Sequence, residues 1–244
     1  MALKQKIRNT IKLLLEPFIN LTGRAKRFKP EKRFWELMYK NFPHGKDFYF
    51  IQVGANDGVS FDNLYDIAKE RLSRGIVIEP MKDFFEKLCY NYRSFPQIIK
   101  VNKAAHPYLK TVGLYRVHPG RQHELQSWAA GIASFDPHHY KKSNTADEYI
   151  IEEKVEAAPL MQIVNEAATG YDVDLLQIDV EGFDYEILKM VDFKKMKPSI
   201  IKYEFINLTK QDLKSSKKLL YKQGYYLFDI DTDTIAILLT KIKL

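Results

Sequence analysis

The chain of 244 residues is 45% hydrophobic and 28% charged, which gives an α/β domain enough apolar material for a core and excludes general disorder. Its one cysteine, Cys89, excludes an intramolecular disulfide framework and a multi-cysteine metal site, and this fits a reducing, cytoplasmic location. Of the net charge of +7, residues 1–33 hold +8 (ten basic, two acidic) and the rest hold −1 (28 basic, 29 acidic), so a nucleic-acid partner for the body is not expected.

The first 33 residues form a basic arm ahead of the domain. Apolar residues recur there at spacings of three and four and line one side of a predicted helix: Leu3, Ile7, Ile11, Leu14, Phe18 and Leu21. The apolar runs are far shorter than the roughly 20 residues that cross a bilayer, and no signal-peptide cleavage site follows. Two interpretations stay open. The arm docks on an anionic membrane at its inner face or on a protein partner, or it packs as a helix on its own domain.

From residue 34 to 244 the chain reads as a single α/β domain, in which predicted strands and helices alternate. The first half predicts strands at Phe48–Val53, Gly75–Glu79 and Ile98–Ala105, and helices at Asp62–Leu72 and Lys82–Tyr92. An irregular insert on the substrate side follows at about 106–158. It contains two stretches that are able to form strands, "TVGLYRVH" and "KVEAAP".

The second half resumes the alternation and ends in a hairpin. It predicts helices at Leu160–Ala168, Tyr185–Val191 and Lys210–Gln223, and strands at Val173–Val180 and Ser199–Phe205. The last two strands, "YYLFDI" and "TIAILLTK", are joined through "DTD", which suits a tight turn and places an antiparallel strand in an otherwise parallel sheet. In such a sheet ligands bind at the carboxyl ends of the strands, so the residues just past each strand are the candidates for a site.

The first candidate is the turn in "IQVGANDG", residues 51–58. Gly54 and Gly58 allow a ligand to approach the backbone, and Asn56 and Asp57 offer polar side chains at the same corner. The spacing is G-x-x-x-G, whereas a dinucleotide site needs G-x-G-x-x-G to hold the pyrophosphate. The turn therefore favours a ligand without a pyrophosphate, such as S-adenosylmethionine, and an ordinary strand-to-helix turn is the alternative.

Carboxylates close two further strands. Glu79 follows Gly54 by 25 residues, near the spacing at which such folds bind ribose hydroxyls, and Pro80 ends the strand there. Asp179 and Glu181 follow the strand in "LLQIDVEG", where two carboxylates in three residues need a partner or a substrate. Helix capping is the alternative function for Glu79 and for one of the pair Asp179 and Glu181.

Together these motifs resemble the FkbM family of S-adenosylmethionine-dependent methyltransferases. The resemblance covers about residues 48–206 and rests, in chain order, on "IQVGANDG", "VIEP", "NKAA", "GIASF", "VDLLQIDVEGFDYEIL" and "IIKYEF". It implies the class I methyltransferase fold, a Rossmann-like, mostly parallel seven-stranded sheet with an antiparallel C-terminal hairpin and helices on both faces. Gln52 and Gln177 depart from the family's pattern, in which many members carry Asp and Lys at these positions.

The resemblance also implies a cofactor site. The residues that it would place against S-adenosylmethionine are Gly54, Ala55, Asn56, Asp57, Gly58, Glu79, Pro80, Asn102 and Asp179. Within this set, the glycine turn would face the methionine part, Glu79 the ribose and Asn102 the adenine.

The family's activity implies O-methylation of a hydroxyl on a sugar, a glycan or a related natural product. An alcohol must lose its proton on methylation, which needs a base or a metal ion. The candidate bases are Asp179, Glu181, Glu204 and His106. The first two carboxylates could instead orient the hydroxyl or hold a divalent ion, although no metal site is assigned. Four residues of the insert stay ambiguous between a site role and a structural one: Trp128, His138, His139 and Tyr140.

Three rival functions share this fold type. A nicotinamide-dependent oxidoreductase would need the glycine fingerprint that is missing here. A nucleic-acid methyltransferase would account for the basic arm, yet no Asn/Asp-Pro-Pro-aromatic signature follows the strand at Val173–Val180. A non-catalytic binding module would keep cofactor affinity and show no turnover.

Overall fold

The computed structural model describes residues 30–60, 64–167, 170 and 172–243. The amphipathic helix predicted between Leu3 and Leu21 lies outside these residues. The first described element is helix α2, Pro30–Asn41, so the boundary expected between arm and domain at residues 33 and 34 falls inside a helix. Within the described ranges, no helix combines the length and apolar character needed to cross a bilayer.

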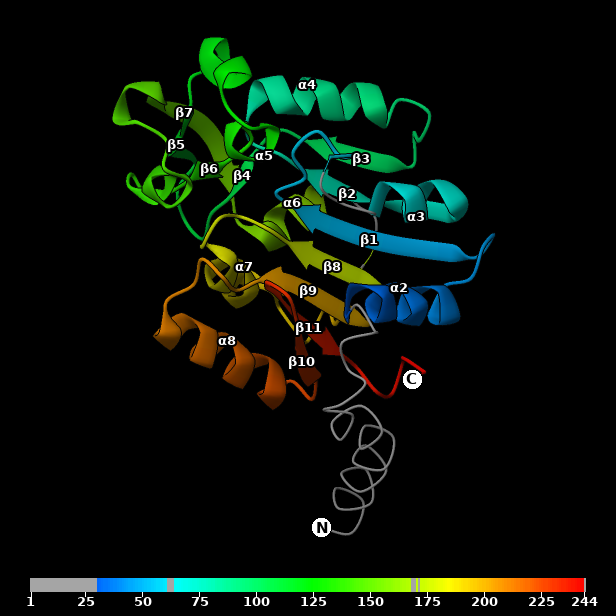
Figure 1. Ribbon diagram of the computed structural model, residues 1–244. Helices are drawn as coiled ribbons and strands as arrows, with labels where there is room; N and C mark the ends of the chain where they lie inside the picture. The colour runs from blue at the N-terminus through cyan, green and yellow to red at the C-terminus, as the bar shows by residue number, and fades with distance from the viewer. Residues whose placement is uncertain (1–29, 61–63, 168–169, 171, 244) are drawn as a thin grey trace.

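A seven-stranded sheet forms the centre of the fold (Figure 1). Its order is β3-β2-β1-β8-β9-β11-β10, and every neighbouring pair is parallel except the two that involve β11. The strands span Asp47–Val53 (β1), Leu72–Ile78 (β2), Ile98–Val101 (β3), Leu175–Ile178 (β8), Ile200–Glu204 (β9), Tyr226–Ile230 (β10) and Asp233–Ile237 (β11). This confirms the predicted mostly parallel sheet with its antiparallel C-terminal hairpin. Asp231 turns the hairpin at φ 49°, a left-handed conformation that Asp tolerates.

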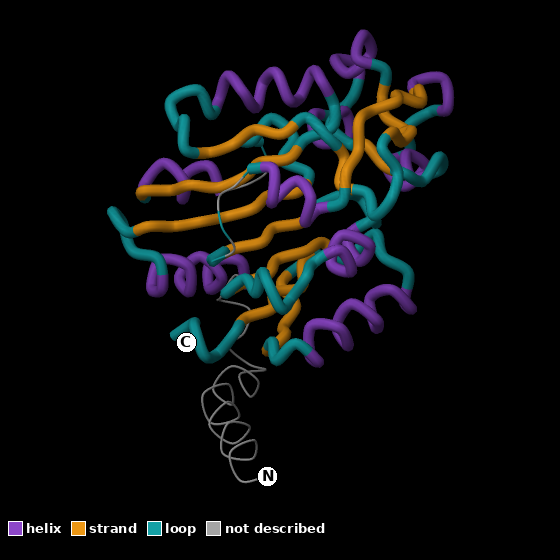
Figure 2. Tube along the Cα trace, turned by 180° about the vertical axis from the view of Figure 1, so that it is seen from behind, coloured by secondary structure: helices purple, strands orange, loops and turns teal. Residues whose placement is uncertain are grey.

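Alternate residues of the strands face two helical layers. On β1, Phe48 and Phe50 pack in the cluster with α2, α3 and α4, whereas Tyr49 and Ile51 pack in the cluster with α6, α7 and α8. Because successive side chains point to opposite faces, the six buried residues of β1 need cover on both. The helices accordingly lie on both sides of the sheet (Figures 1 and 2). They span Leu64–Glu70 (α3), Lys82–Asn91 (α4), Leu160–Glu166 (α6), Asp184–Met190 (α7) and Lys210–Lys222 (α8).

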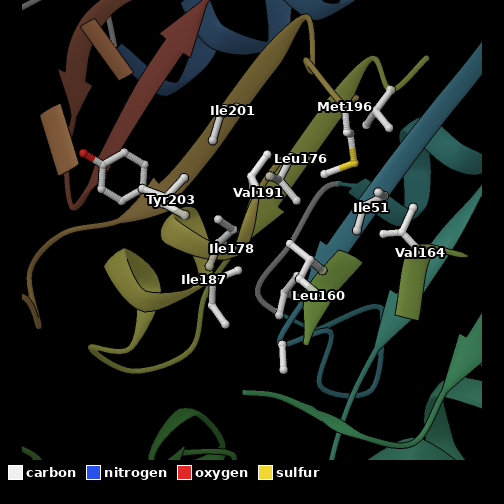
Figure 3. Close-up of a cluster of buried hydrophobic side chains, with 14 of the residues drawn as sticks. Ile51, Leu160, Val164, Leu176, Ile178, Ile187, Val191, Met196, Ile201 and Tyr203 are labelled. Atoms are coloured by element: carbon white, nitrogen blue, oxygen red, sulfur yellow. The ribbon is translucent and has the colours of Figure 1, made fainter. Parts of the chain in front are cut away.

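Figure 3 shows part of the core between the sheet and α6 and α7. Ile51, Leu176, Ile178 and Ile201 come from three adjacent parallel strands, Leu160 comes from α6, and none is more than 1% exposed. Full burial of one such side chain stabilises the fold by about 1.5–3 kcal/mol. This packing holds the carboxyl ends of β1, β8 and β9 at one edge of the sheet.

Residues 104–158 build a second sheet of four strands, which is more regular than the sequence predicts. Its order is β4-β7-β5-β6, and β5 pairs antiparallel with β7 over seven residue pairs, so the two strand-forming stretches of the insert are partners. The remaining residues form short strands and turns of helix. The elements are β4 (Ala104–Ala105), β5 (Thr111–Val117), η2 (Pro119–Glu124), α5 (Ser127–Ala130), β6 (Ala133–Ser134), η3 (His139–Ser143), η4 (Asp147–Tyr149) and β7 (Ile150–Ala158).

The second sheet lies at the carboxyl ends of the parallel strands (Figure 1). Arg116 on β5 ties it to α4. Its guanidinium donates two hydrogen bonds to Asp83, at 2.6 and 2.7 Å, and one to Glu153 at 3.1 Å. Such a bidentate pair fixes orientation as well as distance, so the insert is held over the edge where the predicted site residues emerge.

The chain around β2 and β3 departs most clearly from the predicted bounds. Strand β2 begins at Leu72, which pairs with Asp47, so the helix before it ends at Glu70. The predicted strand Ile98–Ala105 is divided, because the chain leaves the main sheet after Val101 and Ala104–Ala105 pair with β7. Between the two pieces, the Asn102 amide donates to the carbonyls of Glu79 and Pro80 at 2.8 and 2.9 Å, which fixes the change of direction.

Candidate active site

The strand order reverses between β1 and β8, so the segments that leave these two strands face each other at the switch point. Gly54 follows β1 with a φ of 81°, and a Cβ built there would lie 1.8 Å from the backbone oxygen of Asp179. Only glycine fits at this contact. The N–H groups of Gly54 and Ala55 both donate to the carbonyl of Ile78 at 3.0 Å, so the turn is fixed against β2 as well.

A cavity of about 630 Å³ opens at this edge, a size typical of sites for small molecules. Most residues predicted from the sequence line it: Gly54, Ala55, Asn56, Glu79, Pro80, Asp179, Glu181 and Glu204. The structure does not bring the others to the cavity wall: Asp57, Gly58, Asn102 and His106. Gln52 and Gln177, the two departures from the family's pattern, lie opposite each other in the β1–β8 register and also line the cavity.

Glu79 ends β2 with 6% of its surface exposed, and backbone groups hold both of its carboxylate oxygens. Oε2 accepts the N–H of Asn56 and Oε1 accepts the N–H of Met81, each at 2.8 Å. Burial raises the Glu79 pKa to about 7, against the opposing effect of these hydrogen bonds and of the Arg116 charge. A carboxylate has about four lone-pair sites, so each oxygen retains capacity for one hydrogen bond from a ligand. Because Met81 caps α4, Glu79 supports the helix start and the cavity together.

Asp57, Gly58 and Asn102 do not line the cavity. Asp57 Oδ1 accepts the N–H of Ser60 at 2.7 Å, which closes the turn after β1. Partial burial would raise the Asp57 pKa, but the hydrogen bonds from the hydroxyl and the N–H of Ser60 hold it below its usual value. Gly58 has a φ of 78°, and a Cβ there would lie 2.6 Å from the Tyr92 ring. Asp57 and Gly58 thus shape the turn after β1, whereas Asn102 holds the backbone after β2, and the predicted contact of all three residues with the cofactor stays a prediction.

His106 is held in an aromatic cluster away from the cavity. Its ring stacks on Phe183 with centroids 5.8 Å apart and an angle of 12°, and its Nδ1 accepts the N–H of Leu109 at 3.0 Å. Only 7% of the residue is exposed, and burial lowers the pKa of the imidazole. This geometry favours a structural role over a catalytic one.

Three carboxylates gather on the wall opposite Glu79. The Asp179 side chain is open to solvent in the cavity although protein atoms crowd it, and Glu181 and Glu204 are partly buried. Crowding by the surrounding protein atoms, followed by the charges of Glu204 and Glu181, raises the pKa of Asp179 well above its usual value. Burial and the Glu181 charge raise the pKa of Glu204 to about 7. Among the described residues, no group of three or more His, Cys, Asp or Glu side chains has the arrangement of a metal site.

Two residues join this carboxylate group that the sequence did not place there. The Asn207 Nδ2 donates to Glu181 Oε2 at 2.9 Å and to Glu204 Oε2 at 2.8 Å. The His139 Nε2 lies 2.9 Å from Glu181 Oε2, and this histidine of the insert is 4% exposed. Asn207 could have been predicted from the sequence, because it comes three residues after the end of β9 and other site residues also come just after a strand. His139 stayed ambiguous between a site role and a structural one, because its approach to Glu181 depends on how the insert folds back.

The sequence profile of the Methyltransferase FkbM domain matches residues 52–227, well over half of the chain. The chain belongs to the FkbM methyltransferase family. This confirms the family that the motifs predict and with it the class of enzyme, an S-adenosylmethionine-dependent methyltransferase. No curated protein matches the chain significantly.

Several solved structures resemble this FkbM-family chain at low sequence identity. The methyltransferase FkbM from Methylobacillus flagellatus KT is 14% identical over 78% of this chain, which spans 43% of that protein, with a TM-score of 0.48. Precorrin-6y C5,15-methyltransferase from Geobacter metallireducens is 13% identical over 88% of this chain and 90% of its own, with a TM-score of 0.43. Fibrillarin from Aeropyrum pernix, in complex with natively bound S-adenosyl-L-methionine, is 11% identical over 83% and 73%, with a TM-score of 0.40. These likenesses are too distant to assign any site residue, and the family match alone identifies the chain.

Proposed function

We propose that the protein transfers a methyl group from S-adenosylmethionine to a hydroxyl oxygen of a sugar, a glycan or a related natural product. The observation that carries this proposal is the place of Asp179. Its backbone packs against Gly54 of the turn after β1, and its carboxyl, with a raised pKa, opens into the cavity. A carboxylate whose pKa is raised holds a proton more strongly, which suits the role of base for an alcohol.

The residues around the switch point fit the cofactor. Glu79 retains lone pairs for two ribose hydroxyls, and Gly54 leaves free the position that a Cβ would fill. The carboxyls of Asp179 and Glu204 favour a ligand that carries positive charge, because such a charge stabilises their ionised forms. When bound, S-adenosylmethionine supplies an activated methyl group on a positively charged sulfur.

The chain's own contribution is positioning and proton removal. Asp179 would accept the proton of the acceptor hydroxyl as that oxygen takes the methyl group, whose bond to the cofactor's sulfur would break and leave a neutral thioether. The neighbouring charges of Glu204 and Glu181 strengthen the hold of Asp179 on this proton. Holding two reactants in place can lower the activation free energy by about 7–11 kcal/mol, and this positioning is the larger part of the cavity's contribution to catalysis.

The lining of the cavity supports a polar acceptor with a ring face. Trp128 lines it with 48% of its surface exposed, and Lys142 and Ser143 line the same cavity. An exposed indole face beside hydrogen-bonding side chains is a combination that suits a sugar ring. Neither His138 nor Tyr140 is among the lining residues.

The test combines binding and turnover. Calorimetric titration with S-adenosylhomocysteine is expected to show one site, and labelled S-adenosylmethionine is expected to methylate a member of a panel of sugars and glycans. Asp179→Asn should lower turnover roughly 100-fold or more and leave S-adenosylhomocysteine affinity within about 3-fold. The matched control is Asp172→Asn, a carboxylate with 89% exposure that pairs with Lys241 on the surface.

Three results would contradict this proposal. Binding without turnover on any acceptor would indicate a non-catalytic module. A melting shift with NAD(H) and none with S-adenosylhomocysteine would indicate an oxidoreductase. Salt-sensitive binding of RNA or DNA by a chain without residues 1–33 would indicate a nucleic-acid acceptor.

We also propose a cytoplasmic protein whose basic arm, residues 1–33, docks on an anionic membrane surface or a protein partner. The support is the charge of +8 in this segment together with its apolar stripe. Deletion of residues 2–22 should release the protein from vesicles that contain anionic lipid. Equal cosedimentation of the full and shortened chains would favour a helix that packs on its own domain.

A further inference from the structure

Asn207 connects three separate segments at the carboxylate wall of the cavity. It lies in the loop between β9 and α8, and its Nδ2 donates to Glu181 after β8 and to Glu204 at the end of β9. Its Oδ1 accepts a hydrogen bond from Lys142 Nζ of the insert at 2.9 Å. One side-chain amide therefore uses both of its donor hydrogens and its acceptor on charged partners.

The chemistry of these partners fixes the orientation of the amide. A flipped Asn207 would turn its carbonyl oxygen toward two carboxylate oxygens and its NH2 group toward the ammonium of Lys142. Both contacts would then be repulsive. The observed orientation is the one in which every contact is a charge-assisted hydrogen bond, a strong kind of hydrogen bond in proteins.

The backbone of Asn207 also packs closely against the loop after β8. Gly182 has a φ of 98°, and a Cβ built there would lie 3.1 Å from the backbone oxygen of Asn207. Glu181, just before it, has a φ of 54°, which is uncommon for a residue with a side chain. The Glu181 carbonyl accepts a hydrogen bond from Ser134 at 3.0 Å, and its carboxylate meets His139. The loops after β8 and β9 and the insert thus meet at one point.

We propose that Asn207 is a positioning residue of the methyl-transfer site, which holds Glu181 and Glu204 side by side next to Asp179. This inference rests on the proposed function, in which Asp179 is the base. Two ionised carboxylates that accept from the same NH2 group repel each other, and the shared donor offsets that repulsion. Asn207 touches neither reactant in this role and acts through the carboxylates that it holds.

The shared donor has a measurable electrostatic consequence. The hydrogen bond from Asn207 lowers the pKa of Glu204, against the burial and the Glu181 charge that raise it. Among the charges near Asp179, that of Glu204 raises its pKa most. Asn207 therefore favours an ionised Glu204, and an ionised Glu204 favours a proton on Asp179.

Two substitutions should move these equilibria in different ways. In Asn207→Ala the Glu204 pKa should rise, because a donor is lost, and the Asp179 pKa should fall, because its neighbour keeps a proton to higher pH. In Asn207→Asp a fourth carboxylate joins Asp179, Glu181 and Glu204, so the pKa values of Asp179 and Glu204 should both rise. Carbon-13 carboxyl titration of the full chain, labelled at Asp and Glu and assigned with Asp179→Asn and Glu204→Gln, measures both without any substrate.

Binding and turnover complete the test. S-adenosylhomocysteine affinity should stay within about 3-fold in Asn207→Ala, while kcat with an acceptor that the wild type methylates should fall roughly 10-fold to 100-fold. Asn41→Ala is the matched control, because the Asn41 amide also makes two donor contacts, to the carbonyls of Leu37 and Lys243, far from the cavity. It should leave affinity, kcat and both pKa values unchanged.

The inference would be overturned if both variants at Asn207 kept wild-type values for the pKa of Glu204 and of Asp179. It would also be overturned if the variants lost S-adenosylhomocysteine binding together with their fold, as judged by circular dichroism, since that result indicates a purely structural asparagine. Absence of S-adenosylhomocysteine binding by the wild type would contradict the proposed function instead, and the carboxyl titration would still decide whether Asn207 holds the pair.

Discussion

Asp184 opens helix α7 in a place where a charge is unfavourable, and replacing it should change how the stability of the protein depends on pH. The residue is 0% exposed. Its Oδ2 accepts the N–H of Gly182 at 3.2 Å, whereas its Oδ1 has no hydrogen-bond partner in the part of the chain that the structure describes. Burial, and then the charge of Glu204, raises the Asp184 pKa to about 7. The perturbation is Asp184→Asn, which keeps the shape and removes the titration.

The size of the effect follows from the difference between the folded and unfolded pKa values. In the unfolded chain the Asp184 pKa returns to about 3.8, so between about pH 4 and about pH 7 the folded protein holds a proton that the unfolded chain has released. The contribution of this proton to the free energy of unfolding is fully present below about pH 4. It decreases as the pH rises from there and is lost once the pH has passed the folded pKa of about 7. At about 1.4 kcal/mol per pH unit, the wild type should lose about 3 kcal/mol between pH 5 and pH 8 through this group.

Urea unfolding at about pH 5 and about pH 8 measures this loss in the wild type and in Asp184→Asn. The cost of burying an Asn amide does not depend on pH, so it cancels when the change with pH is compared between the two proteins. The variant should lose about 3 kcal/mol less than the wild type over this range. The exposed control Asp172→Asn should follow the wild type. Parallel pH dependence in the wild type and Asp184→Asn would refute the reasoning and show that the buried carboxyl has a usual pKa.

Three further substitutions test other parts of the structure. Glu79→Ala should weaken S-adenosylhomocysteine binding by about 1–3 kcal/mol, the scale for loss of a polar partner, and unchanged calorimetric affinity would remove the ribose assignment. Gly54→Ala should lower the melting temperature and abolish measurable binding, because its Cβ would lie 1.8 Å from the Asp179 carbonyl oxygen; a variant with wild-type melting and affinity would contradict this contact. Arg116→Met should lower the free energy of unfolding by about 2 kcal/mol, below the value for fully buried pairs because solvent still reaches its two carboxylate partners. An unchanged urea midpoint would show that other contacts hold the insert.

The central part of the main sheet could be predicted from the sequence because β1, β2 and β8 each end in an apolar run that is followed by Gly54, Glu79 or Asp179. In β1 the run is covered on both faces, so its hydrophobicity is continuous and identifies a central strand. The insert could not be predicted to the same degree. Strand β7 alternates between exposed and buried residues only near its end, and its pairing with β5 joins Thr111 to Glu156, 45 residues away. Such a pairing depends on tertiary contacts that local patterns do not show.

The candidate site also has a part that the sequence predicts and a part that depends on tertiary contacts. Gly54, Glu79 and Asp179 each follow a parallel strand, and the geometry of the sheet alone brings their backbones to one edge. Asn102 follows a strand too, but its amide is used by two backbone carbonyls, a choice that depends on how the chain turns after β3. His139 reaches Glu181 only because the insert returns over the sheet. Position at a strand end therefore predicts membership of the site well, and it does not predict which groups a side chain contacts.

The carboxyls that make this cavity suitable for a base also make the folded protein less stable as the pH rises. Glu79 and Glu204 each have a pKa near 7, and that of Asp179 is also raised, so folding above neutral pH forces charges into crowded surroundings. A ligand that brings positive charge to the cavity stabilises these charges and so binds the folded chain more tightly where they are ionised. The positive sulfur of S-adenosylmethionine is such a charge. The same groups that would take the acceptor's proton thus link cofactor binding to the stability of the fold.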